Sequence, residues 1–187
     1  MEKRKAKRAK ENITLGSGKV YIAEFSVEDG IPEVETICTP QNLLGYIKGG
    51  ATLTYTEKTY EEKDDLGFVS KVITTSEEAL LKLGLLTWNG NTLKNLADRC
   101  NVTEAEGKRT ILIGGAGNAQ GKIWVVAFAH EDKTDGNLWV VIKGKNQSGF
   151  NLTFAVDSGT VLEPEFKALP QDEEGTLIKL IEEIPAA

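Results

Sequence analysis

Residues 51–75 leave little choice of secondary structure, because apolar or aromatic side chains alternate with polar ones over many positions. The alternation begins with threonines placed between apolar side chains, in the order Ala51, Thr52, Leu53, Thr54, Tyr55 and Thr56. A period of two with β-branched and aromatic residues is typical of a strand. Asp64, Asp65 and Gly67 supply turn chemistry, after which Phe68–Thr75 resumes an extended pattern. The segment is therefore predicted to be a long β-hairpin that projects from the body of the protein.

Most of the remaining chain also has the composition of strands separated by glycine-containing turns. This pattern predicts strands at Lys19–Ser26, Leu43–Tyr60, Arg109–Ile113, Ile123–His130, Leu138–Lys143, Phe150–Val156 and Thr176–Glu183. Val34 and Ile37 indicate a further extended segment that ends at Pro40. Residues Ile123–Phe128 are almost all apolar, so this strand is expected to be buried on both faces or to lie at an interface. The chain is thus predicted to be mainly β.

The segment Thr75–Trp88 fits two structures. Thr75 and Glu78 have the spacing of a helix capping box, and a leucine-rich run follows them. Gly84 interrupts that run, however, and three of its leucines, Leu81, Leu83 and Leu85, recur with a period of two. We favour a strand, with a helix as the alternative.

A short amphipathic helix is predicted at 92–100, after the turn residues Asn89 and Gly90. Asn91 is a suitable N-cap, because its side chain can accept a hydrogen bond from the first helical turn. The apolar side chains that would share one face of this helix are Leu93, Leu96, Ala97 and Cys100.

Charge divides the chain into a basic arm, residues 1–17, and a single acidic domain, residues 18–187. Residues 1–11 hold six basic and two acidic side chains, a formal charge of +4. Since the whole chain carries −6, residues 12–187 carry −10. A basic arm on an acidic body favours self-association through complementary surfaces, and disfavours general nucleic-acid binding by the body. The basic residues of the arm are Lys3, Arg4, Lys5, Lys7, Arg8 and Lys10.

The sequence offers little support for catalysis or for cofactor binding. The glycine-rich run 114–121 has Gln120 where a dinucleotide fingerprint needs its third glycine, and a strand-like segment follows it, so a hairpin loop is expected. The single histidine, His130, lies beside Glu131 and Asp132 before a turn, which suggests a surface residue. The two cysteines match no zinc or redox spacing. We expect no enzymatic activity, no cofactor and no metal.

The chain also has no apolar run of the roughly 18–20 residues that a membrane helix needs, so no membrane association is expected. Its charged N-terminus does not resemble a secretory signal. Trp124 and Trp139 lie among strand residues, which favours packing in the core over binding a sugar.

The order of these elements resembles the major tail tube proteins of long-tailed bacteriophages and of phage-tail-like particles. A basic arm, a long hairpin with a charged tip, one short helix and a run of strands follow one another in that family. The local stretches that resemble it are 74–79 (TTSEEA), 85–89 (LLTWN), 152–154 (LTF), 165–168 (EFKA), Asp172 and 175–178 (GTLI). The resemblance covers about residues 13–183 as a pattern.

This resemblance implies a two-sheet β-sandwich or barrel with one short flanking helix and a long projecting hairpin. It implies a structural virion protein, made in the bacterial host cytoplasm, that forms hexameric rings stacked into a tail tube. Its partners would be further copies of itself and other tail proteins, namely the tape measure, the tail terminator and the baseplate. DNA would pass through the lumen without specific binding. The alternative is a non-enzymatic β-sandwich binding module, such as a carbohydrate-binding virion domain.

Two parts of the chain are the candidates for assembly contacts. The first is the basic arm defined above. The second is the charged tip of the hairpin with an aromatic residue at each end, namely Tyr60, Glu61, Glu62, Lys63, Asp64, Asp65 and Phe68. A hairpin of this length is marginally stable alone, so its strands are expected to gain from packing against a neighbour.

Overall fold

Six antiparallel strands close on themselves in the order β6-β1-β2-β3-β8-β7, because β7 also pairs with β6. The structure is a computed structural model, and it describes residues 17–132 and 136–184 of the chain. The strands of this barrel are β1 (Lys19–Glu24), β2 (Leu43–Lys63), β3 (Ser70–Leu85), β6 (Trp124–His130), β7 (Leu138–Asn146) and β8 (Glu165–Leu169). The mainly β prediction is therefore confirmed.

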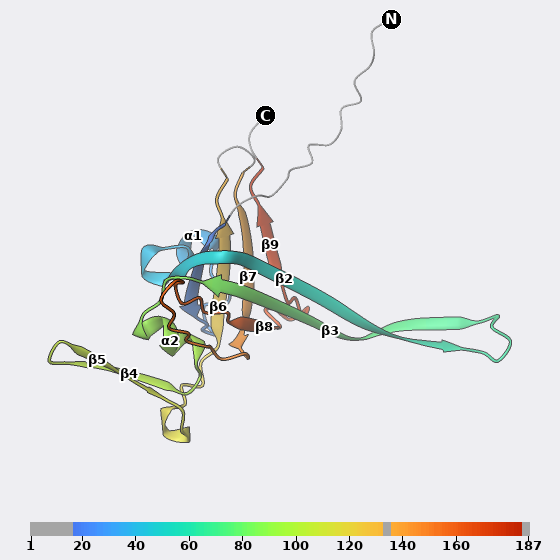
Figure 1. Ribbon diagram of the computed structural model, residues 1–187. Coiled ribbons are helices and arrows are strands. Elements are labelled where there is room, and N and C mark those ends of the chain that lie inside the picture. The colour runs from blue at the N-terminus through green and yellow to red at the C-terminus, as the bar shows by residue number, and fades with distance from the viewer. Residues whose placement is uncertain (1–16, 133–135, 185–187) are drawn as a thin grey trace, which may run out of the picture.

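Three further groups of elements surround the barrel (Figure 1). Strand β9 (Lys179–Glu182) pairs with the first half of β7, and β8 pairs with the second half. Strands β4 (Cys100–Ala105) and β5 (Lys108–Ile113) form a separate hairpin. The helices are α1 (Val34–Ile37), α2 (Gly90–Leu96) and the 3-10 turns η1 (Pro40–Asn42) and η2 (Ala116–Asn118).

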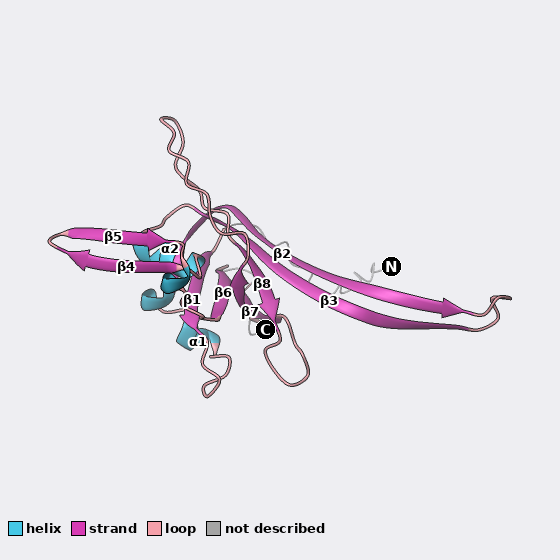
Figure 2. Ribbon diagram, turned by 90° about the horizontal axis from the view of Figure 1, so that it is seen from below, coloured by secondary structure: helices cyan, strands magenta, loops and turns pink. Residues whose placement is uncertain are grey.

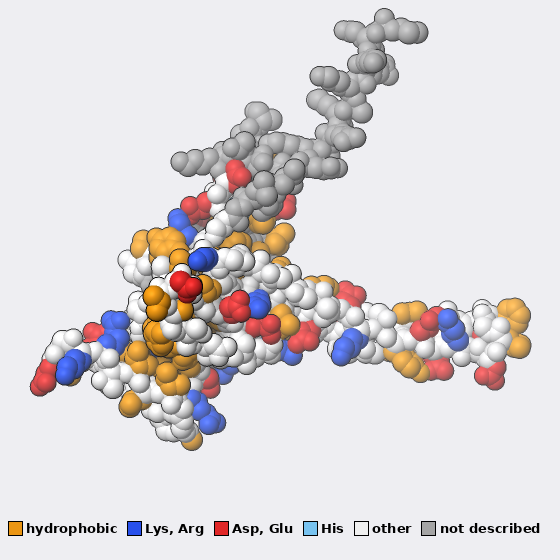
Figure 3. Space-filling model, in the orientation of Figure 1, with side chains coloured by type: hydrophobic (Ala, Val, Ile, Leu, Met, Phe, Trp, Pro, Cys, Tyr) orange, Lys and Arg blue, Asp and Glu red, His pale blue; other side chains and the backbone are white. Residues whose placement is uncertain are grey.

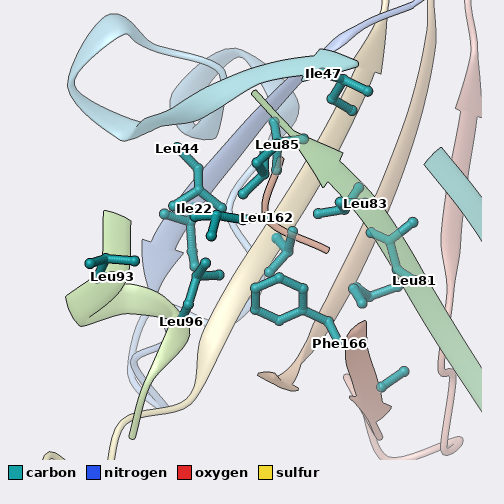
Figure 4. Packing of buried hydrophobic residues seen from close by; sticks show 14 of the residues in the cluster. Ile22, Leu44, Ile47, Leu81, Leu83, Leu85, Leu93, Leu96, Leu162 and Phe166 are labelled. Atoms are coloured by element: carbon teal, nitrogen blue, oxygen red, sulfur yellow. The ribbon is translucent and has the colours of Figure 1, made fainter. Parts of the chain in front are cut away.

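The barrel interior holds the larger of two apolar cores. Side chains from β1, β2, β3, β6, β7 and β8 meet there with Leu93 and Leu96 of α2 (Figure 4). Phe166 of β8 lies in this core with no exposed surface, opposite Leu81 of β3. A second core lies on the other face of β6 and includes Ile37 of α1. Burial of apolar surface on both faces of β6 confirms the expectation for residues 123–128.

Strands β2 and β3 extend far beyond the barrel as the long hairpin (Figures 1 and 2). They contain 21 and 16 residues, whereas strands usually have about 3–10. Every residue of 54–63 and of 70–77 is exposed. The hairpin prediction is confirmed, although its strands reach past residues 51–75 at both ends. From Ala79 onward alternate side chains of β3 enter the core, so the strand interpretation of 76–85 is correct and the capped helix is wrong.

The predicted helix 92–100 begins and ends earlier in the structure. The side chain of Asn89 is the N-cap, accepting hydrogen bonds from the backbone N–H groups of Asn91 and Thr92. The Thr92 hydroxyl oxygen in turn accepts a hydrogen bond from the backbone N–H of Asn89, which completes a capping box. The helix stops at Leu96 because Ala97 is extended, and β4 follows three residues later.

Other sequence predictions also require correction. Residues 34–37 form helix α1, not an extended segment, because Val34 and Ile37 share the face that packs on the second core. Residues Phe150–Val156 form no strand, since Phe154 and Val156 are exposed and have no neighbouring strand. Strands β4 and β8 were missing from the sequence prediction. Strand β8 has only five residues, and the first residue of β4, Cys100, was assigned to the predicted helix.

Candidate assembly surface

The turn at the end of the long hairpin is held by Asp64. Its carboxylate accepts a 2.7 Å hydrogen bond from the backbone N–H of Val69, and its own N–H donates to the Val69 carbonyl at 3.1 Å. Gly67 has a φ of +72°, a conformation that favours glycine. This tight turn leaves the side chains of Leu66 and Phe68 77% and 83% exposed, so both point away from the hairpin into solvent.

The acidic residues next to the turn interact mainly within the hairpin. Glu61 pairs with Lys63 at 3.1 Å. The Tyr60 hydroxyl donates a hydrogen bond to Glu62, and this bond raises the pKa of Tyr60. The structure therefore brings the seven predicted tip residues together at one end of the hairpin, with Tyr60 and Phe68 both exposed.

Sequence reasoning missed further apolar residues on the same part of the hairpin. Ile73 lies directly opposite Tyr60, and Val72 lies opposite Glu61. Figure 3 shows apolar and charged side chains interspersed along the hairpin up to its end. The exposed apolar side chains that were not predicted are Tyr55, Leu66, Val69, Val72 and Ile73. The β-branched residues Val72 and Ile73 were the available signal, because they lie in the segment that the sequence predicts to project from the body. Exposed apolar groups in such number are typical of contact surfaces.

The hairpin is also acidic. Residues 55–79 hold seven acidic and three basic side chains, a formal charge of −4. Glu57 and Glu77 lie directly opposite each other on the two strands, a like-charge pair that disfavours the hairpin. The Tyr55 hydroxyl donates a 2.8 Å hydrogen bond to Glu57, and this bond is the main reason that the pKa of Tyr55 is raised. A cationic partner would relieve the repulsion. The arm candidates Lys3, Arg4, Lys5, Lys7, Arg8 and Lys10 lie outside the described residues.

His130 is not the surface residue that the sequence suggested, since its exposure is only 4%. Its Nδ1 lies 2.9 Å from the carbonyl oxygen of Ser17. Its Nε2 is buried and has no hydrogen-bond partner among residues 17–132 and 136–184. The residues around it were misleading because Glu131 does reach solvent, where it pairs with Lys19 at 2.7 Å. The imidazole thus has a place in the packing between β6 and the segment that precedes β1.

The glycine-rich run 114–121 forms a loop that supports helix α2. Gln120 donates side-chain hydrogen bonds to the carbonyl oxygens of Lys94 and Ala97, at 2.8 and 3.0 Å, and so satisfies the C-terminal end of the helix. Strand β6 follows the loop, where a phosphate-binding loop would need a helix N-terminus. The run is therefore a loop as expected, but the expected hairpin is wrong, because β5 pairs with β4 whereas β6 pairs with β1 and β7.

The tryptophans pack against the two cores. Trp88 and Trp124 contact the barrel core, and Trp139 contacts the second core. Each is half-buried, and the Lys122 ammonium lies 5.7 Å from the centre of the Trp124 ring.

Within residues 17–132 and 136–184, a shallow cleft of about 350 Å³ lies between Tyr55 and Glu77 of the hairpin and residues 174–178. Within these ranges no three His, Cys, Asp or Glu side chains are grouped closely enough to hold a metal ion. None of the helices there has the length and hydrophobicity to span a membrane.

Comparison with known proteins found no matching family model and no similar curated protein. The chemistry of the hairpin and the barrel therefore has to carry any functional conclusion.

Proposed function

We propose that this chain is the structural subunit of a tail tube of a bacteriophage or phage-like particle. The observation that carries the proposal is the long hairpin. It projects from a closed barrel and displays exposed apolar side chains such as Phe68 and Ile73 beside acidic ones. An isolated subunit gains nothing from exposing this surface, whereas a neighbouring copy would cover it.

Unpaired strand edges also support assembly. The distal part of β2 pairs only with β3, and β4 pairs only with β5, among the described residues. Such edges are templates for pairing with another chain. We propose that neighbouring subunits use them in a heterologous contact, which closes into a ring when the rotation between copies allows it. Hexameric rings stacked through the hairpin and the arm would then form the tube.

The proposal extends to partners and location. The net negative charge of residues 12–187 would repel DNA, so that DNA could pass through the lumen without specific binding. The tube would contact the tape measure, terminator and baseplate proteins, would assemble in the host cytoplasm and would remain in the virion. The closed barrel with a flanking helix and a projecting hairpin would be the tail tube fold. No catalytic step is needed for this function.

The experiment is electron microscopy of the concentrated, purified chain, together with analytical ultracentrifugation over a range of salt concentrations. We expect rings or tubes of uniform diameter that form without any ligand. A chain that stays monomeric at high concentration in every buffer would refute the proposal. Binding to a glycan array by such a monomer would favour a carbohydrate-binding module instead.

A further inference from the structure

Strands β5 and β9 each have one edge without a partner strand among residues 17–132 and 136–184. In these ranges β5 pairs only with β4, and β9 pairs only with β7. The β4–β5 hairpin projects from one side of the barrel, and β9 lies on the opposite side (Figure 1). Each edge presents backbone N–H and C=O groups that can accept a strand. Because the two edges of one copy are on opposite sides, each would have to be paired by a second copy.

The pairing of β4 with β5 fixes which backbone groups of β5 point outward. The N–H of Gly114 donates a 2.8 Å hydrogen bond to the Arg99 carbonyl oxygen, so these residues form a hydrogen-bonded pair at the base of the hairpin. Ala105 and Lys108 flank the two-residue turn at 106–107 and form such a pair at its tip. Hydrogen-bonded pairs alternate with non-hydrogen-bonded ones along antiparallel strands. The residues of β5 whose backbone groups face away from β4 are therefore Arg109, Ile111 and Ile113.

The same reasoning applies to β9. The N–H of Glu183 donates a 2.8 Å hydrogen bond to the carbonyl oxygen of Asn137, the residue before β7. Alternate residues of β9 therefore bond to β7, and the residues between them face away from it. The outward-facing residues of β9 are Leu180 and Glu182.

Only some registers can join these two edges, because hydrogen bonding requires outward-facing residues to lie opposite outward-facing residues. One antiparallel register sets Glu182 opposite Arg109, and the next residue along, Glu183, then lies opposite Lys108. Opposite charges that face each other on antiparallel strands attract. This register therefore places the acidic end of β9 against the basic end of β5.

No neighbouring register has this complementarity. A shift by one residue would set inward-facing backbone groups opposite outward-facing ones. A shift by two residues sets Glu183 opposite Glu106 in one direction and opposite Thr110 in the other, and neither shift pairs opposite charges. Backbone hydrogen bonding and charge therefore select the same register.

The selected register also covers exposed apolar side chains. It sets Leu180 opposite Ile111 and diagonally next to Ile113, on one face of the joined sheet. In the single subunit Leu180 is 52% exposed and Ile113 is 53% exposed. Contact between them would remove apolar surface from water and so stabilise the pairing.

Arg109 can bind a second carboxylate while it keeps its present one. Its Nε and one terminal nitrogen contact Glu104 of β4 at 2.7 and 2.6 Å. A guanidinium carries five N–H donors on three nitrogens, so the other terminal nitrogen remains for Glu182. The adjacent Lys108 is exposed.

We propose that β5 of one copy of this chain adds to the free edge of β9 of the next copy in this register. The inference rests on the proposed ring assembly and names the strands that join neighbours within a ring. Because the two edges are different and lie on opposite sides of the subunit, the contact is heterologous, and each copy can bind one neighbour through each edge. The long hairpin and the edges of β2 and β4 remain free for other contacts.

Disulfide cross-linking tests the register. Lys108→Cys and Glu183→Cys, purified separately and mixed before assembly, should form a disulfide-linked pair with one molecule of each, since opposed Cβ atoms lie within bonding range. Neither variant should cross-link to itself. Thr110→Cys mixed with Glu183→Cys is the matched control, two residues out of register, and should stay largely reduced. Wild-type protein controls for the native Cys38 and Cys100.

The outcomes separate this pairing from the proposed function. Rings or tubes that form without the expected cross-link, or a control pair that cross-links as fast, would overturn the pairing and leave the tail tube proposal standing. Self-linking of Lys108→Cys alone would show a symmetric contact of β5 with β5, and would also overturn the pairing. A wild-type chain that stays monomeric at high concentration would overturn both.

Charge exchange tests the ion pair independently. Lys108→Glu and Glu183→Lys should each raise the concentration required for assembly about tenfold, because an attraction between neighbours becomes a repulsion. The double variant Lys108→Glu/Glu183→Lys should restore assembly toward the wild-type concentration. Glu173→Lys is the control, since it makes the same charge change at an exposed turn, and it should shift that concentration by less than about twofold. Circular dichroism should show the same fold in all four variants. Effects that simply add in the double variant, or a control that assembles as poorly as Glu183→Lys, would overturn the pairing.

Discussion

Nδ1 of His130 lies 2.9 Å from the carbonyl oxygen of Ser17, although 113 positions separate the two residues in sequence. The contact joins the end of β6 to the segment that enters β1. Ser17 in turn bonds to Ile47 of β2. One buried imidazole thus helps to hold Ser17 between the end of β6 and the root of the long hairpin.

His130→Ala should destabilise the fold, because it removes a buried side chain and leaves the Ser17 carbonyl without this bond. We expect a loss of about 2–4 kcal/mol in the free energy of unfolding, measured with urea. The control is Glu131→Gln, which breaks an exposed ion pair and should cost no more than about 1 kcal/mol. Equal effects of the two substitutions would show that His130 has no special role in packing. Assembly should depend on His130 only through folding.

Shortening the long hairpin should separate folding from assembly. Lys58 and Ser76 lie opposite each other, so an Asn-Gly turn between them replaces residues 59–75 without disturbing the barrel. Circular dichroism and urea unfolding should show a stable β-fold, whereas electron microscopy should show few or short tubes. Deletion of residues 2–11 should weaken stacking in the same direction. Tubes of normal length and salt tolerance from both variants would mean that other surfaces join the rings.

Gly144 allows β7 and β8 to approach closely. A Cβ atom at this position would lie 2.1 Å from the carbonyl oxygen of Lys167, which is backbone and has little room to move. Gly144→Ala should therefore cost about 2 kcal/mol or more. Gly117→Ala is the matched control, because a Cβ there meets no atom within 4 Å, and it should change stability by less than about 1 kcal/mol. Equal melting temperatures for Gly144→Ala and Gly117→Ala would contradict the close approach of β7 and β8.

The Cys38 thiol should react slowly in the folded protein. Desolvation, with smaller contributions from Glu35 and Glu131, raises the pKa of this thiol from 9.0 to about 11. The reactive thiolate is therefore scarcer at pH 8, and alkylation should be about a hundredfold slower than in the unfolded chain. Peptide-resolved mass spectrometry after timed iodoacetamide treatment measures the rate, which should rise with pH toward 11. An alkylation rate in the folded protein equal to that in the unfolded chain would disprove the raised pKa of Cys38.

The local alternation of side chains was sufficient to predict the long hairpin and most barrel strands. Period two at Leu81, Leu83 and Leu85 reflects one buried and one exposed face. The same period at 51–56 continues into the exposed part of the hairpin. The clustering of charge at the tip also follows from the sequence, since residues 61–65 are consecutive and all charged. Short elements were less predictable. Helix α1 and strand β8 have only 4 and 5 residues, too few for a period to be distinguished.

The sequence by itself determined the mainly β class, the charge of the arm and the projecting hairpin, because these depend on neighbours in the chain. The tertiary structure decided which strands meet. Closure of the barrel through β6 and β7, the burial of His130 against Ser17 and the register of β1 on β2 all join segments remote in sequence. Backbone hydrogen bonding is nearly the same for every strand, so it does not select a partner. That selection comes from the packing of side chains such as Phe166 in a shared core, which no local pattern specifies.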